Sequence, residues 1–178
     1  MNRISFDFFP SACFGTFMLL ALGSTVGCTD PDGAAREAAA KIARLEKSGQ
    51  IPKFDQSTSI AGKDANGNGV RDDIEAYIAV QPLSDVQKKA LLQGGKALQL
   101  SLVTSLDDKV ALDRIGDQSA AAINCLGSVF GESDRGVWIT KIESITVNTR
   151  QRAQRYLEYN KAVSGSSGRM PDGDTCEK

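Results

Sequence analysis

Residues 84–103 read S-D-V-Q-K-K-A-L-L-Q-G-G-K-A-L-Q-L-S-L-V, and this stretch indicates the fold most directly. Ser84 followed three residues later by Gln87 is a capping-box pattern, in which two side chains satisfy free amide groups at a helix N-terminus. Apolar residues then recur three and four positions apart, which is the period of a helix with one buried face. The stretch therefore predicts a long helix with inward-facing Val86, Ala90, Leu91, Ala97, Leu98, Leu102 and Val103.

Gly94 and Gly95 lie in the middle of this predicted helix. Each costs about 1 kcal/mol of helix stability relative to alanine, so a compensating reason for their presence is expected. We interpret the pair as a site of close helix packing or a kink, with a ligand site as the less favoured alternative.

Helical periodicity continues on both sides, and no alternating strand pattern competes with it. Glycine and proline set the boundaries: Gly49 and Gly131 follow helical stretches, and Pro82 breaks another. Residues 28–33 are expected to be a tether, and residues 164–178 a flexible tail after the Ser/Gly-rich linker. The expected fold is all-α, an irregular bundle of about four to five helices. Within a domain of residues 34–163, the further helices are predicted at 34–48, 72–80, 107–131 and 134–163.

Residues 64–75 read D-A-N-G-N-G-V-R-D-D-I-E and point to a specific chemistry. Oxygen-bearing side chains occupy positions 1, 3, 5, 9 and 12 and glycine occupies position 6, which is the layout of an EF-hand calcium loop. Calcium takes six to eight oxygen ligands, so a short segment that supplies them must curl around the ion. The predicted ligands are single side-chain oxygens of Asp64, Asn66 and Asn68, the carbonyl of Val70, Asp72 directly or through water, and both carboxylate oxygens of Glu75.

A plain polar turn is the alternative interpretation, because Asn-Gly pairs are common in turns and two occur here. Acids at both positions 1 and 12 favour calcium. Position 8, usually aliphatic, is Arg71, and no second loop of this type occurs in the chain. A solitary loop with three charged ligands suits structural binding in the extracellular range of dissociation constants, on the order of 0.1–1 mM.

The loop resembles the solitary EF-hand-like calcium loops of bacterial periplasmic and surface proteins. Dockerin modules and thrombospondin type 3 repeats have related Asp/Asn-Gly loops, but theirs are repeated and dockerin loops usually end in Asp. The whole chain resembles small secreted proteins of proteobacteria, through S-I-A-G-K-D-A-N-G-N-G-V-R-D-D-I-E at 59–75 and N-T-R-Q-R-A-Q-R-Y-L-E-Y-N at 148–160. The first resemblance implies one calcium ion, and the second implies no particular activity.

The N-terminus predicts export. Residues 12–22 form an apolar stretch of about eleven residues, too short to span a bilayer and typical of a secretory signal peptide. Small residues follow and end at Cys28, which resembles a bacterial lipobox, although Thr25 stands where leucine is usual. We therefore expect a signal peptide at 1–27, lipidation of Cys28 and a periplasmic, membrane-anchored protein; an ordinary cleaved signal is the alternative.

The two remaining cysteines of the mature chain, Cys125 and Cys176, form an even pair in an oxidising compartment. A disulfide between them is expected to pin the C-terminal tail to the helices. Two unrelated thiols, with Cys125 a small core residue, are the alternative.

Composition excludes several classes of function. The chain has no histidine, which excludes His-ligated zinc sites and catalysis that needs an imidazole base. The net charge of −1 provides no field that would attract nucleic acid. No catalytic constellation is recognisable, so we do not expect an enzyme. A wall or glycan enzyme that uses carboxylates alone is an alternative, and it would need two acids at about 5–10 Å.

Arg152, Arg155 and Tyr159 share a face of the predicted helix at residues 150–161 by their spacing. This face suggests an envelope interaction module that binds anionic lipid headgroups, a polyanion or an acidic partner, and a solvated charged face is the alternative. The leading expectation is an exported, lipid-anchored protein that binds one structural calcium ion.

Overall fold

The computed structural model describes residues 31–178, so the predicted signal peptide at 1–27 and the lipidation site Cys28 lie outside the described residues. Gly131, with φ 74° and ψ 171°, divides α4 into two helical segments. The described part of the chain therefore has six helical segments and no strands, which confirms the all-α prediction with one helix more than expected. The elements are α1 (Pro31–Lys47), α2 (Asp72–Ala79), α3 (Asp85–Val103), α4 (Lys109–Thr146) and α5 (Arg150–Ala162).

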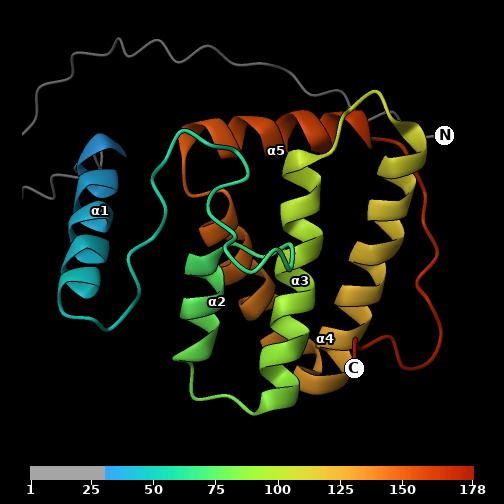
Figure 1. The fold of residues 1–178 in the computed structure, drawn as a ribbon, viewed down its shortest axis with the longest axis horizontal. Coiled ribbons are helices and arrows are strands. Elements are labelled where there is room, and N and C mark those ends of the chain that lie inside the picture. The colour runs from blue at the N-terminus through green and yellow to red at the C-terminus, as the bar shows by residue number, and fades with distance from the viewer. Residues whose placement is uncertain (1–30) are drawn as a thin grey trace, which may run out of the picture.

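The bundle is built around α3. The two parts of α4 and α2 run alongside α3, and α5 crosses one end of this group (Figure 1). The most extensive helix contact is between α3 and α4. α1 stands apart from the others in the same view, and the extended segment 51–63 leads from it back to the bundle.

Apolar side chains from α2, α3 and α4 form one main core. Its members include Val70, which precedes α2, as well as residues of the helices, so the end of the 64–75 loop is anchored in the core. The buried residues are Val70, Ile74, Ile78, Ala90, Leu91, Cys125, Leu126, Ile142 and Ile145. A smaller cluster of Leu112, Ile115 and Tyr159 lies where α4 meets α5.

Val86 and Val103 are exposed, contrary to the prediction that they face inward, and Val110 and Leu157 are exposed as well. The three valines lie within two residues of a helix end, where no neighbouring helix covers them. Leu157 lies on the outer side of α5. Periodicity identified the buried stripe but could not show where along each helix a neighbour ends.

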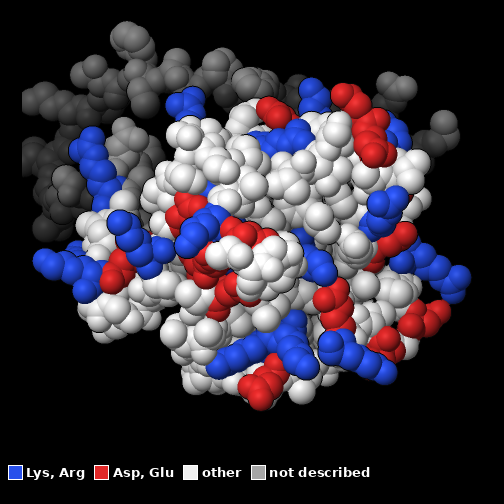
Figure 2. Space-filling model, viewed as in Figure 1, with Lys and Arg blue, Asp and Glu red and all other residues white. Residues whose placement is uncertain are grey.

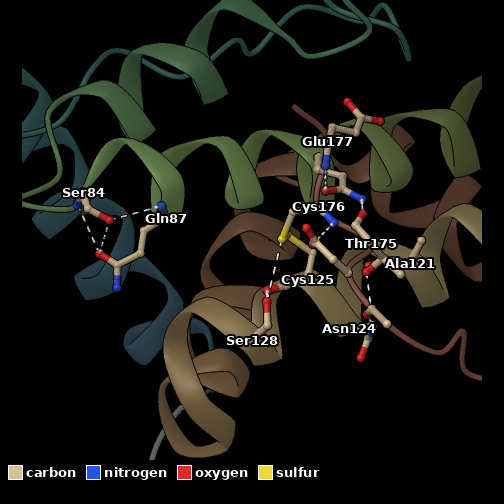
Figure 3. Close-up of a disulfide and its surroundings, with 12 residues drawn as sticks. Ser84, Gln87, Ala121, Asn124, Cys125, Ser128, Thr175, Cys176 and Glu177 are labelled. Atoms are coloured by element: carbon tan, nitrogen blue, oxygen red, sulfur yellow. Dashed lines mark hydrogen bonds between the residues drawn. A yellow bond between two sulfur atoms is a disulfide. The ribbon is translucent and has the colours of Figure 1, made fainter.

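Helix starts follow the predicted capping signals. The Gln87 amide donates to Ser84 Oγ at 3.3 Å and the Ser84 amide donates to Gln87 Oε1 at 3.1 Å, which completes the capping box of α3 (Figure 3). Asp108 Oδ1 accepts the Ala111 amide at the start of α4. α1 begins at Pro31, not at residue 34, so residues 31–33 of the predicted tether are helical. Proline suits a first helical turn because the amide that it lacks would have no partner there.

The prediction of a single helix over 134–163 is wrong. The chain leaves helical geometry after Thr146, and Thr149 then caps α5 by accepting the Arg152 amide on Oγ1 at 3.3 Å. A β-branched residue and a polar capping residue at this point favour a break. The break allows α5 to turn across the end of the bundle.

The predicted disulfide between Cys125 and Cys176 is present, with an S–S distance of 2.02 Å. Residues beside it are also fixed: Thr175 Oγ1 donates to the Ala121 carbonyl at 2.7 Å, and Gln93 Nε2 donates to the Thr175 carbonyl at 2.9 Å (Figure 3). The end of the tail thus lies along α3 and α4, which corrects the expectation that all of 164–178 is flexible. Among the described helices, none is long and apolar enough to cross a membrane.

Candidate metal site

The 64–75 loop lies on the surface between the extended segment and α2 (Figure 1). The part of the loop that precedes α2 is closed, because the amide of Asp72, the first residue of α2, donates to the Lys63 carbonyl at 2.8 Å. Val70 near its end is buried in the core. The loop is therefore a closed turn with one fixed edge.

The carboxylate of Asp64 organises the turn. Asp64 Oδ1 accepts the amides of Gly67 at 2.8 Å and Asn68 at 3.2 Å, and Oδ2 accepts the Gly69 amide at 2.9 Å. Gly67 and Gly69 have φ of 70° and 86°, which is the left-handed region that favours glycine. The chain therefore curls around the first acid of the loop, as the motif predicts.

Positions 3, 5 and 12 of the loop meet at one point. Asn66 Nδ2 lies 3.2 and 3.1 Å from the two carboxylate oxygens of Glu75, and Asn68 Nδ2 lies 2.5 Å from Glu75 Oε1. The side-chain oxygen of each asparagine accepts a hydrogen bond from the backbone amide two residues later. Asn66 Oδ1 accepts from the Asn68 amide, and Asn68 Oδ1 accepts from the Val70 amide. The fold thus brings three of the predicted ligands together.

Asp72 faces a different way from Glu75. Its Oδ1 accepts the Ala65 amide at 2.8 Å and its Oδ2 lies 3.3 Å from Lys63 Nζ. The Ala65 hydrogen bond, followed by the contact with Lys63, holds the pKa of Asp72 below its usual range. Within residues 31–178, no three His, Cys, Asp or Glu side chains are grouped closely enough to hold a metal. Any ion site here would therefore have to use the two asparagines.

The donor set fits a hard cation. Asp64, Asn66, Asn68 and Glu75 supply side-chain oxygens from one closed turn, and oxygens are the ligands that calcium takes. The nitrogens of both asparagine amides now face Glu75, so a half turn of each amide would present an oxygen instead. That turn gives up the hydrogen bonds to the Asn68 and Val70 amides, a cost that the cation must offset.

Arg71, at position 8, has a role that the sequence interpretation missed. Its side chain is fully buried and donates from Nε and Nη2 to the Asp73 carboxylate, at 2.9 and 2.7 Å. It also donates to the carbonyls of Ile145 at 3.1 Å and Thr146 at 3.0 Å. These are the last carbonyls of α4, which have no partner within the helix. Arg71 therefore fastens the loop to the end of α4, where a paired EF-hand would use an aliphatic contact with a second loop.

Arg152 is also fully buried, so it cannot present a charge to solvent. It donates to the carbonyls of Asp55 at 2.7 Å, Ser59 at 2.9 Å and Ile60 at 3.3 Å, and its Nη2 lies 3.4 Å from Asp55 Oδ1. Desolvation, and next the charge of Arg71, lowers the pKa of Arg152. Arg152 thus holds the extended segment in place from α5.

The predicted exposed face of Arg152, Arg155 and Tyr159 is therefore not present. Tyr159 is buried with Arg152, and Arg155 donates to the carbonyls of Leu102 and Thr104 at the end of α3. Helical spacing places these residues on one face, but that face packs against the bundle. The sequence carries no local signal of this burial, because the acid that pairs with Arg152, Asp55, is distant in the chain and belongs to no periodic pattern.

Gly62 lies between the two buried arginines. A Cβ atom there would lie 2.4 Å from Arg71 Cδ and 2.9 Å from Arg152 Nη2, and φ is +68°. The Asp55 amide donates to Asp73 Oδ2 at 2.8 Å, which connects the two acids. The base of the loop thus rests on one buried network of two arginines and two aspartates.

The surface around the loop carries mixed charge. Figure 2 shows acidic and basic side chains interspersed on this face, without a large field of one sign. Comparisons with known protein families, with curated proteins and with solved structures found no match. The function must therefore be argued from the site itself.

Proposed function

We propose that this protein is exported and lipid-anchored, and that it binds one structural calcium ion in the 64–75 loop. The observation that carries the calcium proposal is the convergence of Asn66 and Asn68 on the Glu75 carboxylate in a turn organised by Asp64. Export and anchoring rest on the apolar N-terminal stretch and Cys28.

The ion would act on the shape of the bundle edge. It would offset the repulsion among Asp64, Asp72 and Glu75, three acids of one short turn. Among the described side chains, only Lys63 forms an ion pair with one of them, Asp72. The exit of the loop is already attached to α4 through Arg71. Calcium would therefore fix the exposed part of the turn, since the other part is already held by the core.

Calcium titration by calorimetry, with thermal melting in calcium and in chelator, tests this function. We expect one site, and at 100-fold excess over the dissociation constant a gain of about 2.7 kcal/mol in the free energy of unfolding. Glu75→Gln removes the charge where three ligands meet, so binding should be lost. Glu37→Gln, on exposed α1, is the matched control and should bind as the wild type does. An unchanged melting temperature in millimolar calcium would rule out the calcium site.

The anchor is tested by fractionation of cells that express the wild type or Cys28→Ser. We expect the wild type in the membrane fraction and Cys28→Ser released as unlipidated protein, because one thioether-linked lipid group carries the attachment. Membrane recovery equal to that of the wild type would contradict anchoring at Cys28 and leave the calcium result unaffected.

A further inference from the structure

A cavity of about 330 Å³ lies between α3, the two parts of α4, and α5, away from the calcium loop. Its volume is in the range of small-molecule sites, about 300–1,000 Å³. No residue of the 64–75 loop lines it. Its walls are mostly apolar, with Leu91, Ala97 and Leu98 from α3 and Ala122, Leu126 and Ile142 from α4.

One carboxylate faces this apolar space. Glu143 lines the cavity, and the lining contains no lysine or arginine. Among the described side chains, none forms an ion pair with Glu143. Glu143 also lies in the last turn of α4, where the helix dipole places partial negative charge. A half-buried anion at the negative end of a helix favours a positively charged ligand.

Two aromatic rings also favour a cationic ligand in this cavity. Tyr156 and Tyr159 line the same cavity, with ring centroids 6.3 Å apart and planes inclined by 10°. Burial, and next the charge of Glu143, raises the pKa of Tyr156, so the charge of this acid reaches the tyrosine. Ammonium groups bind favourably over the faces of aromatic rings.

Gly94 leaves the cavity open without a packing requirement. A Cβ atom there would meet only Leu126 Cδ1, at 3.4 Å, which is close to ordinary contact. Its neighbour Gly95 faces three side chains at 3.5–3.7 Å in the core. Glycine lowers helix stability relative to alanine. At Gly94 the absence of a side chain leaves the cavity open.

We propose that this cavity binds a small amphipathic amine, with its apolar body between α3, α4 and α5 and its ammonium group between Glu143 and the tyrosine rings. Glu143 and the aromatic pair select the cation, and the apolar walls select the body. This site is independent of the calcium loop.

Calorimetric titration with octyltrimethylammonium, octanol and octanoate tests the proposal, since the three probes share a chain and differ in charge. We expect the ammonium probe to bind about tenfold more tightly than octanol, and octanoate to bind most weakly. Glu143→Gln should remove the preference for the cation and keep octanol binding. Glu158→Gln, an exposed acid on α5 outside the lining, is the matched control and should keep the preference.

Two further variants test whether the probes bind in this cavity and not in the calcium loop. Gly94→Leu fills the cavity and should abolish binding of all three probes, with circular dichroism as the check on folding. Glu75→Gln should leave amine binding unchanged. No binding of the ammonium probe, equal affinity for the three probes, or a cation preference that survives Glu143→Gln would each overturn the proposal, whether or not Gly94→Leu folds.

Discussion

Two irregular segments lie along the helical bundle, residues 51–71 and residues 173–177, and they are attached by different means. The first is held by the buried guanidinium groups of Arg71 and Arg152, which bind backbone carbonyls and two aspartates. The second is held by a disulfide and by the side-chain amides of Gln93 and Asn124.

The difference matters because the two attachments fail differently. If one member of a buried ion pair is removed, the remaining charge stays buried without a partner, and its desolvation carries a large free-energy cost. A disulfide acts mainly by restricting the unfolded chain, so its loss can release the C-terminal segment without leaving a buried charge unpaired. The segment that leads into the candidate calcium loop therefore depends on every member of a charged network, whereas the C-terminal segment is held by one covalent bond and by hydrogen bonds from uncharged side chains.

The two segments meet at Lys96 of α3. The Lys96 side chain lies against Gly69 of the loop, with its Cγ 3.3 Å from the position of a Cβ there, and its Nζ lies 3.8 Å from Glu177 Oε1. This contact is exposed and weak. We therefore expect the two attachments to be broken almost independently.

Arg152→Met should have the largest effect. It leaves Asp55 and three backbone carbonyls without their donor, and loss of one member of a buried ion pair costs about 3–5 kcal/mol. Urea unfolding measures the change. Arg150→Met, on the exposed first turn of the same helix, is the control and should change stability by less than about 0.5 kcal/mol. Equal costs for the two variants would show that the buried network does not hold the segment.

Loss of the disulfide should follow in magnitude. Cys125→Ser with Cys176→Ser opens a link between residues 51 apart in sequence, for which the chain-entropy estimate is about 4 kcal/mol at most. Hydrogen exchange should show loss of protection at Cys176 and Glu177 and unchanged protection at the Asp72 amide. Ser128→Ala, which removes only a hydroxyl 3.7 Å from Cys176 Sγ, is the control. Lost protection at Asp72 would mean that the two segments are coupled.

Acid should weaken the first attachment and spare the second. The hydrogen bond from the Ser57 side chain, backbone amides of Ser57 and Lys63, and the charge of Arg152 hold the pKa of Asp55 well below its usual range, against desolvation. A lowered pKa in the folded state means that this carboxylate stabilises the protein fully above its unfolded pKa of about 3.9, and that the stabilisation is lost as pH falls through the folded value.

Thermal melting between pH 7 and pH 2 checks this dependence. Asp55→Asn should be less stable than the wild type at pH 7, and the difference should begin to shrink below about pH 4, because Asp55 of the unfolded wild-type chain then takes up a proton while the folded carboxylate stays ionised. Thr175→Val, which removes a hydrogen bond of the disulfide-linked segment and no titrating group, is the control and should differ from the wild type by the same amount at every pH. A difference between Asp55→Asn and the wild type that stays constant with pH would contradict the role of the Asp55 charge.

Local chemistry made several features predictable. Ser84 and Gln87 mark the start of α3, Asp108 that of α4, and Gly131 the kink, because each acts through backbone groups within four residues of it. The pairing of Cys125 with Cys176 followed from the even number of cysteines together with the expected oxidising compartment. The break before Thr149 was missed because apolar spacing continues across it and outweighs the local signal of a capping residue.

The sequence by itself determined an all-helical chain, its capping sites, its disulfide pair and a loop whose oxygen-bearing residues are spaced for calcium. These are properties of residues close together in sequence or of residue counts. Only the tertiary structure decided that Arg71 and Arg152 are buried, because an arginine on a helical face looks the same whether it meets water or the carbonyls of a distant segment. The backbone carbonyls that these two arginines bind lie more than seventy residues away in the chain.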